Sequence, residues 1–140
     1  MPDRKLTVLL ADDDEVYVLC YKVCLEDAGF EVITAKTRFE LLDYAPMTQA
    51  LVVDACLPSL EMEGIEAVAE LLDENQIGGP RIAADVPIIF NSGYGEDTPT
   101  VRDKLRGYPV LANRYEWVCK DGEIEVLIDA INRLRRRRRR

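Results

Sequence analysis

The sequence contains no histidine. This absence excludes zinc sites built on imidazole, Ser-His-Asp triads and Cys-His dyads, because each of them needs that side chain. Cysteine is also scarce, with four residues that fall inside expected helices and strands rather than in a loop-rich framework: Cys20, Cys24, Cys56 and Cys119. We therefore expect reduced thiols rather than disulfides, and we expect Cys20 and Cys24 to pack in the core.

Long apolar runs and glycine-rich phosphate-binding motifs are missing as well. No run approaches the roughly 20 apolar residues that a membrane-spanning helix needs, and the first residues lead into a short strand pattern rather than a signal-peptide core. We therefore expect a cytoplasmic protein without a transmembrane segment. Neither GxGxxG nor the P-loop motif occurs, which disfavours nucleotide-binding enzymes.

Positive charge is concentrated at the end of the chain. The sequence has 26 acidic and 18 basic residues, a net charge of −8, and six of the basic residues form the run from Arg135 to Arg140. The rest of the chain is therefore more acidic than the net charge indicates, and we expect no nucleic acid to bind the folded body, since that needs a basic face. Two interpretations of the run stay open: contact with a polyanion, or a solvated extension of the last helix.

The length of 140 residues and the apolar fraction of 48% suit one domain, which we assign to residues 1–134, followed by a basic tail at 135–140. Five short apolar runs predict buried strands at residues 6–11, 31–35, 50–53, 87–90 and 116–119. Helical patterns alternate with them, between Asp14 and Gly29 and at residues 38–44, 64–73, 97–106 and 123–135. This alternation predicts a doubly wound α/β fold with a parallel sheet covered on both faces.

Apolar spacing also predicts which side of each helix is buried. In the first helix, the residues at helical spacing are Val16, Leu19, Cys20 and Val23. In the second helix, Phe39 and Leu42 share one face. In the third, the inward residues are Ile65, Val68, Ala69 and Leu72.

Five polar residues lie just past the ends of the expected strands: Asp12, Asp13, Asp54, Ser92 and Lys120. Because the carboxyl ends of parallel strands meet at one edge of a sheet, we expect these side chains to converge. Three neighbouring carboxylates repel one another unless a cation neutralises them, so the cluster predicts a site for a hard ion such as Mg²⁺. With a lysine and a hydroxyl added, the set supplies what phosphoryl transfer needs: positive charge for the phosphoryl oxygens and a carboxylate that attacks phosphorus.

Four short motifs surround these residues in order along the chain: Leu-Leu-Ala-Asp12-Asp13-Asp14, Val-Val-Asp54-Ala-Cys-Leu-Pro58 with Glu63-Gly64, Ile-Ile-Phe-Asn-Ser92-Gly93, and Trp117-Val-Cys-Lys120. Together they resemble the response-regulator receiver domain of two-component signalling, of the chemotaxis-regulator type, over nearly the whole chain. The resemblance implies a flavodoxin-like, five-stranded parallel sheet with the strand order 2-1-3-4-5.

The resemblance also implies a phosphoacceptor and a metal site. Asp54 would accept the phosphoryl group. Mg²⁺ would be held by Asp13, Asp54 and the backbone carbonyl of Cys56, and Asp12 would hold it through water. The protein would then be a phosphoprotein signalling domain that assists its own phosphorylation and dephosphorylation, rather than an enzyme acting on other substrates.

Two further roles and the partners follow from the same resemblance. Ser92 and Lys120 would contact the phosphoryl oxygens, and Ser92 would act with Trp117 as a switch that responds to phosphorylation. The phosphodonor would be a sensor histidine kinase or a histidine phosphotransfer protein. The output protein or domain is open, as is whether the chain acts alone or within a longer protein.

Two alternative functions, from other classes of protein, stay open. A phosphatase of the haloacid dehalogenase type also uses a strand-end aspartate, but it needs a second aspartate two residues later, where this chain has Cys56. A pseudo-receiver would bind a partner without being phosphorylated. The complete acidic set, with Ser92 and Lys120, argues against it.

Overall fold

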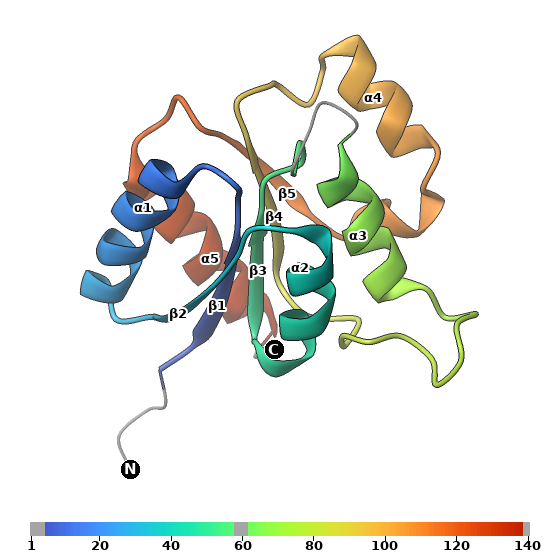
Figure 1. Ribbon diagram of the computed structural model, residues 1–140, viewed down its shortest axis with the longest axis horizontal. Coiled ribbons are helices and arrows are strands. Elements are labelled where there is room, and N and C mark those ends of the chain that lie inside the picture. Colours follow the sequence, from blue (N-terminus) through green and yellow to red (C-terminus); the bar gives the residue numbers. More distant parts are fainter. Residues whose placement is uncertain (1–4, 58–61, 139–140) are drawn as a thin grey trace.

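Five parallel strands form the centre of the protein in a computed structural model, which describes residues 5–57 and 62–138. The strands are β1 (Thr7–Ala11), β2 (Glu31–Ala35), β3 (Ala50–Val53), β4 (Ile88–Ser92) and β5 (Glu116–Cys119). Their order across the sheet is β2-β1-β3-β4-β5, and every neighbouring pair is parallel (Figure 1). The expected strand order and the doubly wound α/β architecture are therefore confirmed.

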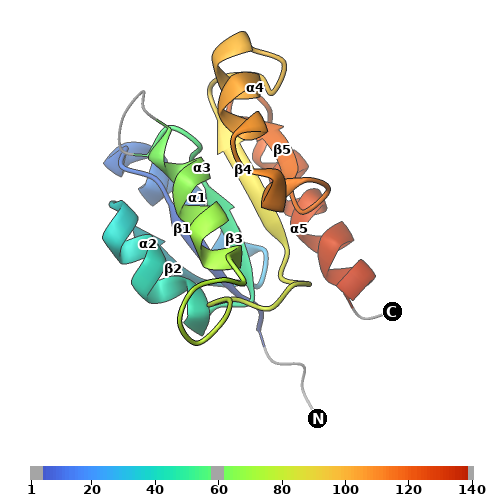
Figure 2. The same cartoon turned by 90° about the vertical axis from the view of Figure 1, so that its right-hand side faces the viewer.

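Helices cover both faces of the sheet. They are α1 (Glu15–Asp27), α2 (Arg38–Tyr44), α3 (Glu63–Leu72), α4 (Pro99–Arg106) and α5 (Ile124–Arg138), with the short 3-10 helices η1 (Ala45–Met47) and η2 (Pro109–Leu111). Helices α1 and α5 lie on one face, whereas α2, α3 and α4 lie on the other (Figure 1 and Figure 2). The sheet therefore separates two apolar cores.

The central strand β1 shows why its sequence is an uninterrupted apolar run. Val8 and Leu10 belong to the core under α1 and α5, whereas Leu9 and Ala11 belong to the core under α2 and α3. All four side chains are at most 1% exposed. A strand with alternating polar residues would bury polar groups on one of these faces, so the run has to be apolar throughout.

Helix α1 begins and ends as predicted but turns the opposite side to the sheet. Asp14 caps it by accepting hydrogen bonds from the backbone of Val16 and Tyr17, and Gly29 follows it with φ +99°. The predicted apolar face is nevertheless exposed, with Val16 at 74% and Leu19 at 64%, and the helix buries other residues, Val18 and Leu25. The helix carries two apolar stripes, and spacing alone does not identify the one that meets the sheet.

Of the other predictions of buried residues, some are wrong and some are confirmed. Cys20 is exposed and Cys24 is half-buried, so the predicted core packing of Cys20 is wrong; all four cysteines are free. In α2, Phe39 is 77% exposed and Leu41 is buried in its place. In α3, the four residues predicted to face inward are all buried: Ile65, Val68, Ala69 and Leu72.

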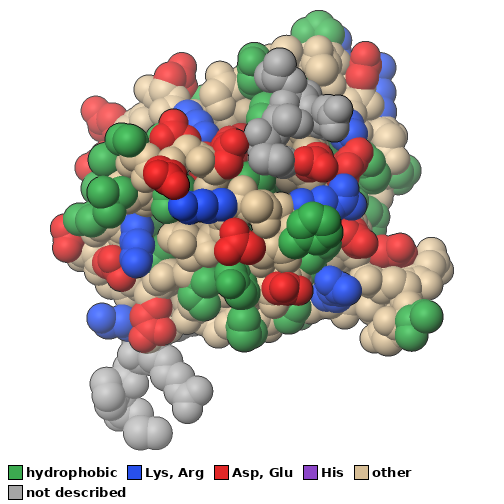
Figure 3. All heavy atoms as spheres, in the orientation of Figure 1, with side chains coloured by type: hydrophobic (Ala, Val, Ile, Leu, Met, Phe, Trp, Pro, Cys, Tyr) green, Lys and Arg blue, Asp and Glu red, His purple; other side chains and the backbone are tan. Residues whose placement is uncertain are grey.

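The C-terminal helix is longer than predicted and includes part of the arginine run. Helix α5 continues to Arg138, so the run from Arg135 extends the helix. On the face drawn in Figure 3, the described lysine and arginine side chains are interspersed with aspartate and glutamate. Among residues 5–57 and 62–138, no helix has the length and apolar character that crossing a membrane requires.

Candidate functional site

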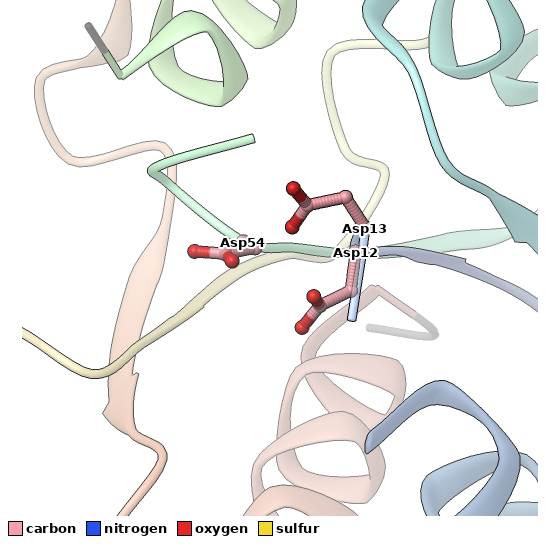
Figure 4. Close-up of side chains that lie close together, drawn as sticks. All are labelled: Asp12, Asp13 and Asp54. Atoms are coloured by element: carbon pink, nitrogen blue, oxygen red, sulfur yellow. The ribbon is translucent and has the colours of Figure 1, made fainter. Parts of the chain in front are cut away.

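The predicted polar residues come from the carboxyl ends of four strands. Asp12 and Asp54 directly follow β1 and β3, Ser92 is the last residue of β4, and Lys120 directly follows β5. Carboxylate oxygens of Asp12, Asp13 and Asp54 all lie within 4.8 Å of one another; we call these residues the aspartate cluster. Figure 4 shows their three carboxylates directed to the same side of the sheet edge. The expected convergence is therefore present for the three carboxylates.

Backbone groups orient the two buried carboxylates of this cluster. Asp12 Oδ1 accepts a hydrogen bond from the backbone N–H of Asp14 at 2.9 Å, and Asp54 Oδ1 accepts one from the backbone N–H of Cys56 at 3.0 Å. The second oxygen of each points to Lys120, whose Nζ is 2.6 Å from Asp12 Oδ2 and 3.0 Å from Asp54 Oδ2. Each carboxylate thus has one oxygen held by the chain and one by the ammonium group.

Burial and charge act against each other at this ion pair. Burial raises the pKa of Asp12 above its ordinary value, although hydrogen bonds from Lys120 and the Asp14 backbone work in the other direction. Burial alone would lower the pKa of Lys120, but the hydrogen bond to Asp12 and the charge of Asp54 outweigh it and raise that pKa. Lys120 therefore stays protonated and serves as an internal cation for the two carboxylates.

The aspartate cluster fits a divalent cation that prefers oxygen ligands. Mg²⁺ is commonly held by one or two carboxylates and several waters. The three clustered aspartates can supply the carboxylate ligands. Asp13 is exposed, so solvent reaches this side of the cluster, whereas Asp12 is 1% exposed. Cys56, whose carbonyl was expected to be a ligand, lies in the turn that its own N–H closes on Asp54.

Steric crowding explains why position 64, in the Glu63-Gly64 motif, is a glycine. A β-carbon at position 64 would lie 2.1 Å from the carbonyl oxygen of Asp54, which is far inside van der Waals contact. Only glycine lets the first turn of α3 approach the backbone of the turn after β3 this closely. Gly64 thus helps to set the position of the Asp54 turn.

Ser92 and Cys56 lie together beside the aspartate cluster. Ser92 is fully buried, its Oγ accepts a hydrogen bond from the backbone N–H of Tyr94 at 3.1 Å, and its hydroxyl also contacts the Cys56 side chain. Burial and the negative charge of Asp54 raise the pKa of the Cys56 thiol. Cys56 is therefore held as a neutral thiol.

Trp117 lies outside the cluster, on β5. Its ring centroid is 5.6 Å from that of Phe90, and its Nε1 donates a hydrogen bond to the carbonyl of Tyr94 at 2.9 Å. Tyr94 therefore connects to Ser92 through its N–H and to Trp117 through its carbonyl. The chain thus provides a two-bond path between the two residues expected to form the switch.

Two residues were missed by the sequence analysis: Tyr17, which lies beside Lys120, and Asn91, which contacts Tyr17. The ring centroid of Tyr17, on α1, is 4.4 Å from Lys120 Nζ, and Tyr17 Oη accepts a hydrogen bond from Asn91 Nδ2 at 2.7 Å. Burial, together with a contact to the Tyr21 hydroxyl, raises the pKa of Tyr17, which is therefore a neutral phenol. The one sign in the sequence was Asn91, a polar residue between the apolar run of residues 87–90 and Ser92.

Among the comparisons with known proteins, the one with solved structures shows the fold. No protein-family model and no curated protein matches the sequence. Many solved structures match the chain over nearly its whole length, and these include receiver domains of response regulators. The protein therefore has the receiver-domain fold of response regulators.

Three solved structures illustrate the likeness. A receiver-domain protein from Methanospirillum hungatei has a TM-score of 0.75 and 20% sequence identity, covering 97% of this chain and 98% of its own. The receiver domain of a Francisella response regulator has a TM-score of 0.72 and 24% identity, covering 95% of this chain and 98% of its own. A Burkholderia pseudomallei response regulator, solved with a phosphorylated aspartic acid and a calcium ion, has a TM-score of 0.69 and 20% identity, covering 91% of this chain and 66% of its own.

Proposed function

We propose that this protein is a phosphorylation-controlled signalling switch in which Asp54 accepts a phosphoryl group with Mg²⁺ as cofactor. The observation that carries the proposal is the Lys120 ammonium, placed 2.6 Å from Asp12 and 3.0 Å from Asp54 at the strand ends of a receiver fold. It supplies fixed positive charge beside the carboxylate that would attack phosphorus. The proposed donor is a phosphohistidine on a sensor histidine kinase or a histidine phosphotransfer protein.

The residues at the strand ends divide the chemistry between them. The Asp54 carboxylate would attack phosphorus as the bond from phosphorus to the donor atom breaks, and the donor would leave with that electron pair. Mg²⁺ held by the aspartate cluster and the Cys56 carbonyl would offset the charge of the phosphoryl oxygens. Lys120 and the Ser92 hydroxyl would bind those oxygens. The phosphorylated aspartate and the calcium ion in the Burkholderia structure support this assignment by analogy.

The phosphatase alternative lacks one of its required groups. That class needs an acid-base carboxylate two residues after the nucleophile, and this chain has Cys56 there. The raised pKa of the thiol keeps it protonated near neutral pH, so it would not serve as the base. The switch remains the function that the site supports best.

Incubation with acetyl phosphate and Mg²⁺ tests the proposal. We expect one base-labile phosphoryl group per chain in wild type and none in Asp54→Asn, because a carboxamide does not attack phosphorus in this way. Asp14→Asn is the matched control, since it changes a nearby carboxylate that caps α1 and should leave labelling intact. Full labelling of Asp54→Asn, or labelling that needs no divalent metal, would contradict the proposal.

The path through Tyr94 supports a proposed response at Trp117. A phosphoryl group on Asp54 would draw the Ser92 hydroxyl toward its oxygens and so disturb the hydrogen bond from the Tyr94 backbone. We expect the fluorescence of Trp117, the only tryptophan, to change when phosphodonor is added to protein already in Mg²⁺. Ser92→Ala should take phosphate without that change. A wild-type spectrum that phosphorylation leaves unaltered would remove Trp117 from the switch.

For the arginine run we propose contact with a polyanion. Because the run continues α5 as far as Arg138, replacing its six arginines with glutamine is a cleaner test than truncation. We expect wild type to bind nucleic acid or acidic vesicles with an affinity that falls steeply as salt rises, and the variant to lose this binding. Equal binding of wild type and variant would show that the run is only a solvated extension of the helix.

A further inference from the structure

We propose that Tyr17 is a positioning residue that holds the Lys120 ammonium beside Asp54. This inference rests on the proposed phosphorylation of Asp54, to which it adds a residue on α1 that takes no part in the chemistry itself. Tyr17 would act through Lys120 by its ring face. Asn91, on β4, would act one step further away, by holding Tyr17.

The Tyr17 ring is a third neighbour of the Lys120 ammonium group, in addition to Asp12 and Asp54. Lys120 Nζ lies 4.4 Å from the Tyr17 ring centroid while it contacts Asp12 at 2.6 Å and Asp54 at 3.0 Å. A cation within about 6 Å of an aromatic face is attracted by the ring's electron density. The Lys120 side chain is only 19% exposed, so water screens this attraction little.

The ring is itself fixed by two neighbours. Asn91 Nδ2 donates a hydrogen bond to Tyr17 Oη at 2.7 Å, and Tyr21 stacks on the Tyr17 ring with centroids 3.9 Å apart and planes 28° apart. These contacts come from β4 and from the next turn of α1. Tyr17 therefore presents its ring face to Lys120 in a defined orientation.

The buried Asn91 side chain lowers the stability of the fold in order to hold Tyr17. It is 2% exposed in β4, directly after three buried apolar residues, and its Oδ1 has no hydrogen-bond partner among the described residues. An unsatisfied buried amide oxygen destabilises a fold, so an apolar residue would suit the strand better. The compensating contact that the structure does provide is the hydrogen bond from Nδ2 to Tyr17.

The ring contact has a distinct use during phosphoryl transfer. Lysine is a compact charge on a flexible stem, and its position depends on its partners. When Asp54 accepts a phosphoryl group, one of the two carboxylates that hold the ammonium is converted. The attraction to Tyr17 does not depend on that carboxylate, so it keeps Lys120 near the phosphoryl oxygens before and after the transfer.

Three variants distinguish the effect of the Tyr17 ring on Lys120 from the effect of the Tyr17 hydroxyl and from a general loosening of α1. Tyr17→Leu removes the ring, Tyr17→Phe keeps the ring but loses the partner of Asn91, and Tyr21→Leu makes the same change one turn away. We expect Tyr17→Leu to lower the rate of Asp54 phosphorylation by acetyl phosphate in Mg²⁺ by about 3- to 30-fold, the range that corresponds to a partly buried cation–π contact. Tyr17→Phe and Tyr21→Leu should stay within about 2-fold of wild type, since each keeps the ring beside Lys120 and one of the two contacts that orient it.

A second readout reports the contact without phosphorylation. In protein labelled with ¹³C at the lysine ε-carbons, the Lys120 ε-protons, assigned with Lys120→Arg, should be shifted upfield by the ring current of Tyr17. The shift should persist in Tyr17→Phe and Tyr21→Leu and vanish in Tyr17→Leu. A general loosening of α1 would affect Tyr17→Leu and Tyr21→Leu alike, so the contrast between them isolates the ring contact.

Each outcome bears on one claim. A Tyr17→Leu variant that labels at the wild-type rate, or a Tyr17→Phe variant that is as slow as Tyr17→Leu, would overturn the positioning role. An unshifted Lys120 resonance in wild type would overturn the contact itself. If wild type takes up no phosphate, the proposed function fails, and the resonance alone decides whether Tyr17 holds Lys120.

Discussion

Replacing Lys120 with methionine is expected to lower the free energy of unfolding of the metal-free protein by about 3 to 5 kcal/mol, the cost of leaving a buried charge unpaired. The change keeps the length of the side chain but removes the cation that contacts Asp12 and Asp54, whose side chains are 2% and 10% exposed. Urea denaturation in the presence of a chelator measures the loss. Adding Mg²⁺ should restore more stability to the variant than to wild type, because the metal ion then supplies the missing charge.

Lys104→Met is the matched control for this experiment. Lys104 also forms an ion pair, but its partner Glu66 is 27% exposed and is held by Arg38 as well. We expect a loss of at most about 1 kcal/mol, because solvent reaches this half-buried pair and Arg38 still contacts Glu66 after the change. Similar losses in the two variants, or a Lys120→Met variant as stable as wild type, would contradict the role of Lys120 as an internal cation.

Replacing Asp13 with alanine is expected to remove most of the stabilisation that Mg²⁺ gives. A ligand at one hundred times its dissociation constant stabilises the native state by about 2.7 kcal/mol, and a variant that binds about 100-fold more weakly keeps only about 0.4 kcal/mol. Thermal melts with chelator and with Mg²⁺ measure the difference. The metal-free melting temperature should rise only slightly, because Lys120 already offsets the other two carboxylates.

The neighbouring Asp14→Ala variant is the control for Asp13→Ala. Asp14 caps α1 and is not part of the aspartate cluster. Its loss should cost about 1 kcal/mol with or without metal, as for other N-caps, and should leave the gain from Mg²⁺ unchanged. An Asp13→Ala variant with the wild-type response to Mg²⁺ would exclude Asp13 as a ligand.

The sheet was predictable from the sequence because its strands are buried on both sides. A run such as the one in β1 is apolar at every position only when both faces of the strand meet a core. Helix α1 was predictable in its ends but not in its orientation. It has an exposed apolar stripe that includes Val16 and Leu19 and a buried one that includes Val18 and Leu25, and only the packing against the sheet distinguishes them.

The strand-end residues of the site could be predicted for a related reason. Once the strands are known to be parallel, the residues after β1, β3 and β5 must share one edge, which brings Asp12, Asp54 and Lys120 together. Tyr17 could not be predicted, since it comes from the helix face that the spacing had assigned to solvent. The link through Tyr94 depends on backbone groups, which leave no trace in the sequence.

The most direct test of the central claim is to locate the phosphoryl group chemically. Wild-type protein is incubated with acetyl phosphate and Mg²⁺, treated with sodium borohydride, which reduces an acyl phosphate to an alcohol, and digested for mass spectrometry. Phosphorylation of Asp54 predicts homoserine at position 54 and unchanged aspartate at positions 12 and 13. Homoserine at another aspartate, or phosphate retained on Ser92 with Asp54 unmodified, would contradict the account.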